Sequence, residues 1–140
     1  MPLTPKNGFS EVKHTADLEL KAWGQDLPSL FEQAAQGMYH LMGMAFAKEQ
    51  PEPIPLTFHI AGIDYEDLLV TFLAELLYLL DEKQLAFTSL NLEISENALK
   101  CQGSGSLIVS RERGIKAATY HNIKILKTKN GLEVNIVFDI

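Results

Sequence analysis

The hydrophobic pattern is clearest after residue 17, where apolar residues at 18, 20 and 22 alternate with the polar Glu19 and Lys21. A two-residue period is typical of a strand with one buried and one exposed face. Asp17 directly precedes the alternation and has the parity of its polar positions. We therefore expect Asp17 at the start of a strand, on the face that points away from the core.

Two later stretches have the period of an amphipathic helix, and they predict helices over residues 27–42 and 64–80. The first would begin after the N-cap Asp26, with Pro28 in its first turn, and would end at Gly43. The second would begin at the N-cap Asp64. Its wide apolar face predicts that it forms the centre of the core, and consists of Leu68, Leu69, Phe72, Leu73, Leu76, Leu77 and Leu80.

Further alternations predict strands over residues 56–60, 90–95 and 99–109. Gly103-Ser104-Gly105 lies in the last of these. It lacks the lysine and the following helix of a phosphate-binding loop, so we expect a bend or bulge there.

The C-terminal part of the chain predicts a hairpin of two strands, residues 115–127 and 132–140. Asn130-Gly131 is well suited to a two-residue type I′ turn between them. In that register Lys127 faces Val134, and Asp139 lies across from Asn122 on the face opposite the core.

This order of elements predicts an α+β fold, with two main helices packed on a largely antiparallel sheet in a single domain of residues 1–140. Hydrophobic residues make up 46% of the chain and charged residues 21%, as in ordinary soluble proteins. The N-terminal residues contain no apolar signal core, and the longest apolar run, residues 76–80, is too short to span a membrane. With a single cysteine, Cys101, which we interpret as a buried strand residue, the sequence predicts a cytoplasmic protein.

The net charge of −6 is unevenly distributed along the chain. Residues 100–129 contain seven of the 12 basic residues and only one acid, Glu112. Solvated strand faces account for most such lysines, and an acidic chain is a poor candidate for unassisted binding of nucleic acid. We therefore expect contact with RNA to be weak or indirect.

Both Asp17 and Asp139 are placed on polar faces at strand ends, and Asp139 is followed by Ile140. If the two strands are antiparallel neighbours, two side-chain carboxylates and the terminal carboxylate converge. With His14 as the only nitrogen donor nearby, such a site favours a hard cation, Ca²⁺ or Mg²⁺, over zinc. No activated nucleophile is visible in the sequence, so we predict no catalytic residues.

Several blocks in order resemble the archease family, and together they cover nearly the whole chain. They are His14-Thr15-Ala16-Asp17, Ala22-Trp23-Gly24, Leu30-Phe31-Glu32-Gln33-Ala34-Ala35, Asp64-Tyr65-Glu66-Asp67-Leu68-Leu69, Lys116-Ala117-Ala118-Thr119-Tyr120-His121 and Asp139-Ile140. The resemblance implies a small α+β domain with helices against a largely antiparallel sheet. It also implies a divalent cation, usually calcium, bound by Asp17, Asp139 and Ile140.

By the same resemblance, the chain would be a non-enzymatic accessory protein that activates the GTP-dependent RNA ligase of tRNA splicing and RNA repair. It would promote guanylylation and turnover of the ligase, with Lys116, Thr119 and Tyr120 supporting the site or the contact. One departure from the family pattern is Lys13, at an often acidic position, whose ammonium group would weaken metal binding if it reached the site. The alternative is a chaperone-like modulator of other RNA-processing enzymes, such as tRNA methyltransferases.

Overall fold

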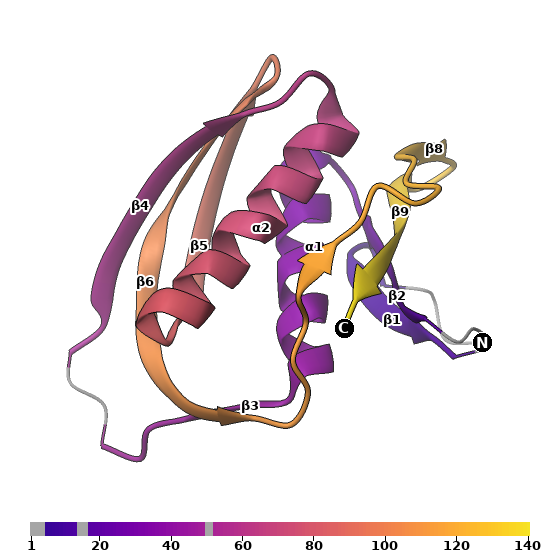
Figure 1. Ribbon diagram of the computed structural model, residues 1–140. Coiled ribbons are helices and arrows are strands. Elements are labelled where there is room, and N and C mark those ends of the chain that lie inside the picture. Colours follow the sequence, from indigo (N-terminus) through magenta and orange to yellow (C-terminus); the bar gives the residue numbers. More distant parts are fainter. Residues whose placement is uncertain (1–4, 14–16, 50–51) are drawn as a thin grey trace.

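Two helices lie between two antiparallel sheets in the computed structural model, which describes residues 5–13, 17–49 and 52–140 (Figure 1). In chain order the elements are β1 (Gly8–Val12), β2 (Leu18–Gly24), α1 (Leu27–Met42), β3 (Met44–Phe46), β4 (Ile54–Ala61), α2 (Tyr65–Lys83), β5 (Leu85–Ser95), β6 (Ala98–Arg111), β7 (Ala117–Ala118), β8 (Leu126–Thr128) and β9 (Gly131–Asp139). The predicted α+β class is confirmed. The strands, however, are divided between two sheets.

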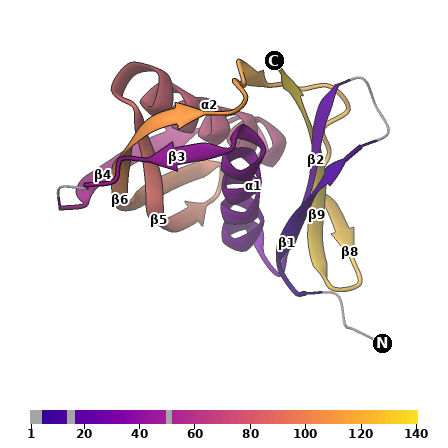
Figure 2. The same cartoon turned by 90° about the horizontal axis from the view of Figure 1, so that it is seen from below.

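The first sheet has five strands in the order β1-β2-β9-β7, and β8 also pairs with β9. The second has four strands, with β6 paired to β3, β4 and β5. The view from below shows α1 between the two sheets (Figure 2). Every strand pair found among the described residues is antiparallel. No helix in this part of the chain is long and apolar enough to cross a membrane.

Both predicted helices are present. Helix α1 spans the predicted residues 27–42, its N-cap Asp26 accepts a hydrogen bond from the Ser29 amide at 2.9 Å, and Gly43 ends it in a left-handed conformation. Helix α2 begins after the N-cap Asp64, as predicted, but continues to Lys83. It ends at Gln84, whose φ of 52° makes it a non-glycine C-cap that the sequence does not signal.

Aromatic side chains from both helices and both sheets meet in one core. Phe31 of α1 and Phe72 of α2 are fully buried, with ring centroids 5.8 Å apart. Phe58 of β4 lies 6.2 Å from Phe72, and Phe138 of β9 is buried in the same cluster. Burial of these rings therefore joins each sheet to the helices between them.

The C-terminal hairpin differs from the prediction. Residues 115–127 form only the short β7 and β8, separated by a loop that contains Asn122 at a φ of 50°. Thr128 pairs with Gly131, so the turn residues are 129 and 130 rather than Asn130-Gly131. Lys127 therefore pairs with Leu132, not Val134.

Asp139, in turn, pairs with Ala117 rather than lying across from Asn122. The reason is that a residue in the left-handed region cannot continue an extended strand. The loop between β7 and β8 is instead bound to α2, where the Ile125 amide donates to the Glu66 carboxylate at 2.9 Å.

The Gly103-Ser104-Gly105 stretch is part of the long strand β6, and a register shift lies beside it. The extra residue belongs to the partner strand β5, between Phe87 and Ser89. A bulge is thus present at the predicted place, but on the neighbouring strand.

Candidate metal site

Asp17 and Asp139 lie at the same end of the five-stranded sheet. Strands β2 and β9 are antiparallel neighbours, and their outermost pair is Leu18 with Phe138. Asp17 directly precedes Leu18 and Asp139 directly follows Phe138, so the two aspartates come immediately after the last pair of this register. The strand adjacency that the sequence hypothesis required is therefore present.

Both aspartates are exposed, whereas the flanking Leu18 and Phe138 are buried. This alternation places the carboxylates on the sheet face that points away from the helices. Ile140 follows β9 directly and is 57% exposed. The predicted site residues thus gather at one sheet end without support from the hydrophobic core.

Strand β7 fixes the end of β9 from the other side. The Lys116 amide donates to the Asp139 carbonyl oxygen at 2.7 Å. Two residues earlier on β9, the Val137 carbonyl accepts from both the amide and the hydroxyl of Thr119, each at 2.9 Å. Lys116 and Thr119 therefore support the main chain of the candidate site.

The donor set fits a hard cation, since all of its candidate ligands are oxygen atoms. Within residues 5–13, 17–49 and 52–140, no group of three or more His, Cys, Asp and Glu side chains could hold a metal ion. Asp17 and Asp139 supply only two side-chain carboxylates, so a site here depends on main-chain oxygens of Ile140 and on water. His14 lies outside the described residues, and Lys13 is exposed just beyond β1.

A pocket of about 290 Å³ adjoins Asp17, and most of its lining was not identified from the sequence. It is lined by Asp17, Glu19, His121, Asn122, Asn135 and Val137. The Asn135 amide donates to the Glu19 carboxylate at 3.0 Å. Parity with the two aspartates could have indicated Glu19 and Asn135. His121 and Asn122 come from the loop between β7 and β8, for which periodicity gives no signal.

The Tyr120 side chain contacts the start of α2. Its hydroxyl donates to the Asp67 carboxylate at 2.6 Å, and the other Asp67 oxygen accepts from the Ile63 amide at 3.0 Å. The hydrogen bond from Tyr120 lowers the pKa of Asp67 and raises the pKa of Tyr120 itself. Tyr120 therefore holds the 119–125 loop against α2.

The basic residues of the 100–129 window do not form one surface. Lys100 is on β6 of the four-stranded sheet, whereas Lys127 is on β8 of the five-stranded sheet. Arg111 pairs with Asp81 of α2 at 3.0 Å. The positive charge of the sequence window is therefore dispersed in space.

Cys101 is fully buried in β6, as predicted. Burial raises the pKa of its thiol to about 12, so the reactive thiolate is scarce at neutral pH.

The fold and this site define a two-sheet α+β domain with two exposed aspartates at the end of one sheet. The sequence matches the profile of the archease protein family (MTH1598/TM1083) over residues 9–140. The chain belongs to the archease family. It is 31% identical to Protein archease of Methanosarcina acetivorans over 143 aligned positions, covering 94% of this chain and 95% of that protein.

Two solved structures have a similar fold. The solution structure of Methanobacterium thermoautotrophicum protein 1598 matches with a TM-score of 0.69 and 25% identity, over 95% of this chain and 99% of that chain. The crystal structure of an archease from Thermotoga maritima, described as a possible chaperone, matches with a TM-score of 0.67 and 23% identity. That match covers 94% of this chain and 96% of the Thermotoga chain.

Proposed function

We propose that this chain is a non-enzymatic accessory protein that activates the GTP-dependent RNA ligase of tRNA splicing and RNA repair. It acts through a divalent cation bound by Asp17, Asp139 and Ile140 at the end of the five-stranded sheet. The observation that supports the proposal is the β2–β9 register, whose last pair is Leu18 with Phe138, so that each aspartate is the next residue of its own chain segment. The resemblance of the His14–Asp17 block and of Asp139-Ile140 to the archease family implies the same residues.

The chain's own residues form and orient the cation site. Asp17 and Asp139 extend from two neighbouring strands, so the sheet sets their separation. The Lys116 amide holds the main chain of Asp139, which limits movement of the residue before Ile140. When bound, the cation would neutralise these carboxylates and offer coordination positions to oxygen atoms of a partner.

The surroundings of the site suit a protein partner better than a small substrate. Ile140 is 57% exposed beside the carboxylates, and the adjoining pocket is lined largely by polar side chains. An apolar residue next to charged groups is typical of a protein contact with a polar rim. We infer that this end of the sheet docks on the ligase.

The direct test is the rate of ligase guanylylation at a low molar ratio of this protein to ligase. Wild-type protein should accelerate guanylylation when present at about one molecule per ten ligase molecules, because an activator that is released can act repeatedly. Asp17→Asn and Asp139→Asn should each abolish the acceleration, because each removes one of the few anionic ligands of the cation.

Glu93→Gln is the matched control, since Glu93 is an exposed acid on β5 of the other sheet. It removes one negative charge without touching the site, and it should activate like the wild type. Full activation by both aspartate variants in limiting calcium would refute the proposed mechanism.

The description of the Thermotoga relative as a possible chaperone gives the second candidate function its support. A chaperone-like modulator of enzymes such as tRNA methyltransferases would reduce their aggregation, and would need roughly stoichiometric amounts to do so. Suppression of methyltransferase aggregation by wild type and both aspartate variants alike, with no effect on the ligase, would favour this candidate.

A further inference from the structure

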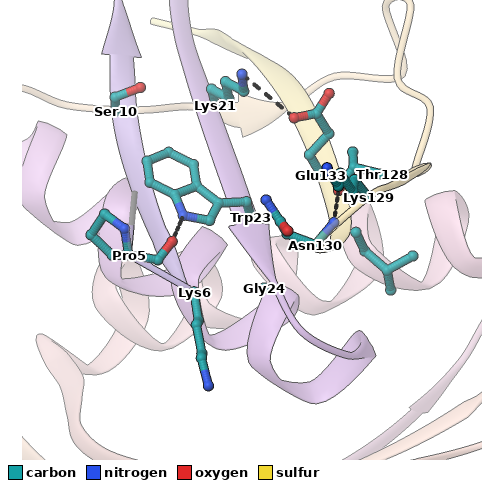
Figure 3. A pocket seen from close by; sticks show the side chains of 11 residues that line it. Pro5, Lys6, Ser10, Lys21, Trp23, Gly24, Thr128, Lys129, Asn130 and Glu133 are labelled. Carbon is teal, nitrogen blue, oxygen red and sulfur yellow. Dashed lines mark hydrogen bonds and ion pairs between the residues drawn. The ribbon is translucent and has the colours of Figure 1, made fainter. Parts of the chain in front are cut away.

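A pocket of about 350 Å³ lies on the five-stranded sheet at the end away from Asp17 (Figure 3). Trp23 of β2 is at its centre, with Lys6 and Pro5 on one side and Asn130 on the other. Trp23 lies six positions after Asp17, which corresponds to about 20 Å along an extended chain. The pocket is therefore separate from the candidate metal site, and the function proposed for that site does not use it.

The indole of Trp23 is fixed in place by two neighbours. Its Nε1 donates a hydrogen bond to the Pro5 carbonyl oxygen at 2.9 Å. Its ring also packs against Gly8, the cross-strand partner in β1, where an added Cβ would lie 2.5 Å from Cζ2 of the indole. The ring is half-buried, so the part that β1 leaves uncovered lines the pocket.

The pocket is positively charged although the chain carries a net charge of −6. It is lined by the three lysines Lys6, Lys21 and Lys129, against one acid, Glu133. Lys21 and Glu133 lie 3.5 Å apart and largely compensate each other. Lys6 and Lys129, both exposed, leave an excess of positive charge on the two sides of the indole.

We propose that this pocket binds a nucleotide, with its base stacked on Trp23 and its phosphate held by Lys6 and Lys129. An aromatic platform beside basic side chains is the usual arrangement for a nucleotide base and its phosphate. Ser10, Thr128 and Asn130 also line the pocket and supply polar groups for the base edge or the ribose.

The size and composition of the pocket favour a single nucleotide unit over other phosphate-bearing ligands. Its volume is near the lower end of the roughly 300–1,000 Å³ of small-molecule sites. Phosphopeptide sites rely on clusters of arginine, and none of the described residues that line this pocket is an arginine. The nucleotide is either a free mononucleotide or one unit of a single-stranded RNA.

Trp23 is the only tryptophan of the chain, so the indole N–H resonance in a ¹H–¹⁵N NMR spectrum reports directly on the pocket. The protein is titrated separately with guanosine monophosphate (GMP), guanosine, inorganic phosphate, phosphotyrosine and a hexauridylate. We expect GMP to shift the indole resonance at lower concentration than guanosine or phosphate, because only GMP uses both the ring and the lysines.

Four variants test the assigned roles. Lys6→Gln and Lys129→Gln should each weaken GMP binding about two- to fivefold, as expected for exposed charge pairs. Trp23→Ala should weaken GMP binding about tenfold or more. Because this variant has no indole, its binding is measured from the shift of the Ser10 backbone amide resonance. Trp23→Phe keeps an aromatic ring if the alanine variant does not fold, and it should retain part of the affinity. Lys100→Gln, on β6 of the other sheet, is the matched control and should bind GMP unchanged.

The comparison of ligands separates the two sources of the nucleotide. Tighter binding of the hexauridylate than of GMP identifies an RNA strand, and the reverse order identifies a free mononucleotide. The proposal is overturned if neither shifts the indole resonance at millimolar concentration. It is equally overturned if inorganic phosphate or phosphotyrosine acts as strongly as GMP, or if Lys100→Gln weakens binding as much as Lys129→Gln.

Discussion

The Tyr120 hydroxyl donates a 2.6 Å hydrogen bond to the Asp67 carboxylate, joining the loop between β7 and β8 to the first turn of α2. This bond spans 53 positions of the sequence and connects the C-terminal part of the chain with one of the two central helices. The 119–125 loop also contributes His121 and Asn122 to the pocket beside Asp17. The Tyr120–Asp67 contact therefore fixes a segment that lines the candidate metal site.

Loss of this bond should change how Asp67 titrates. Tyr120 lowers the pKa of Asp67 in the folded protein, so the bond stabilises the fold above the unfolded-state pKa, and this contribution disappears as the pH falls through the folded-state pKa. Tyr120→Phe should raise the pKa of Asp67, as measured by an NMR titration of its carboxyl carbon. Tyr78 is an exposed tyrosine elsewhere on α2, so Tyr78→Phe is the control. An unchanged pKa of Asp67 in the Tyr120→Phe variant would contradict this account.

Gly103 should be intolerant of any side chain. A Cβ at this position would overlap the carbonyl oxygen of Ser89 in the neighbouring strand β5. Gly103→Ala must therefore force β6 away from its neighbour β5, and we expect a loss of about 2 kcal/mol or more in the free energy of unfolding. Urea denaturation measures the loss.

Gly114→Ala provides the control for that substitution, because nothing lies within 4 Å of a Cβ at this exposed position. Its free energy of unfolding should change by less than about 0.5 kcal/mol. Equal stability of the two variants would show that β5 and β6 can separate without cost.

The N-cap of α2 should contribute measurably to stability. The Asp64 carboxylate accepts a hydrogen bond from the Asp67 amide at 2.8 Å, which satisfies an otherwise unpaired donor of the first turn. Asp64→Ala should cost about 1 kcal/mol in urea denaturation, whereas Asp64→Ser, which keeps a capping oxygen, should cost less. Equal losses in the two variants would show that the charge of Asp64, not its capping bond, is what matters.

Local periodicity predicts much of this fold because each helix has its own apolar stripe and its own cap. The same information does not show which strands pair across the chain. Strand β2 pairs with β9, more than 100 positions away, and only the structure establishes that pairing. The hairpin register was predicted wrongly by two residues, yet a shift of two leaves every side chain on its original face. The exposure of Asp139 follows instead from the alternation along β9 itself, which does not depend on its partner, Ala117 rather than Asn122.

The candidate site was only partly predictable, because local periodicity describes its strands but not the loop beside them. Asp17 and Asp139 belong to alternating strands, whose parity can be read from the sequence. His121 and Asn122 lie in an irregular loop whose position depends on Tyr120 and on the Ile125 amide bound to Glu66. Such long-range contacts leave no periodic trace in the sequence.

The final prediction concerns the charge of the candidate metal site. Asp17 and Asp139 adjoin the last pair of the β2–β9 register, and like charges on neighbouring strands repel each other by roughly 0.2–1 kcal/mol when directly opposed and without a cation. Asp139→Asn should therefore make the metal-free protein slightly more stable than the wild type. Glu93→Gln, which removes a charge on the other sheet, should not.

In the presence of calcium the order of stability should reverse. At a calcium concentration 100 times the dissociation constant, binding adds about 2.7 kcal/mol to the wild-type protein. At about 4 °C per kcal/mol, the melting temperature should rise by about 10 °C.

Asp139→Asn should lose most of this rise, because the cation then has one anionic ligand fewer, and Asp17→Asn should lose it too. Magnesium should act in the same direction as calcium, since the ligands are all oxygen. Thermal unfolding after exhaustive chelation and after addition of calcium measures both effects. If Asp139→Asn gains as much from calcium as the wild type does, the cation does not bind at this end of the sheet.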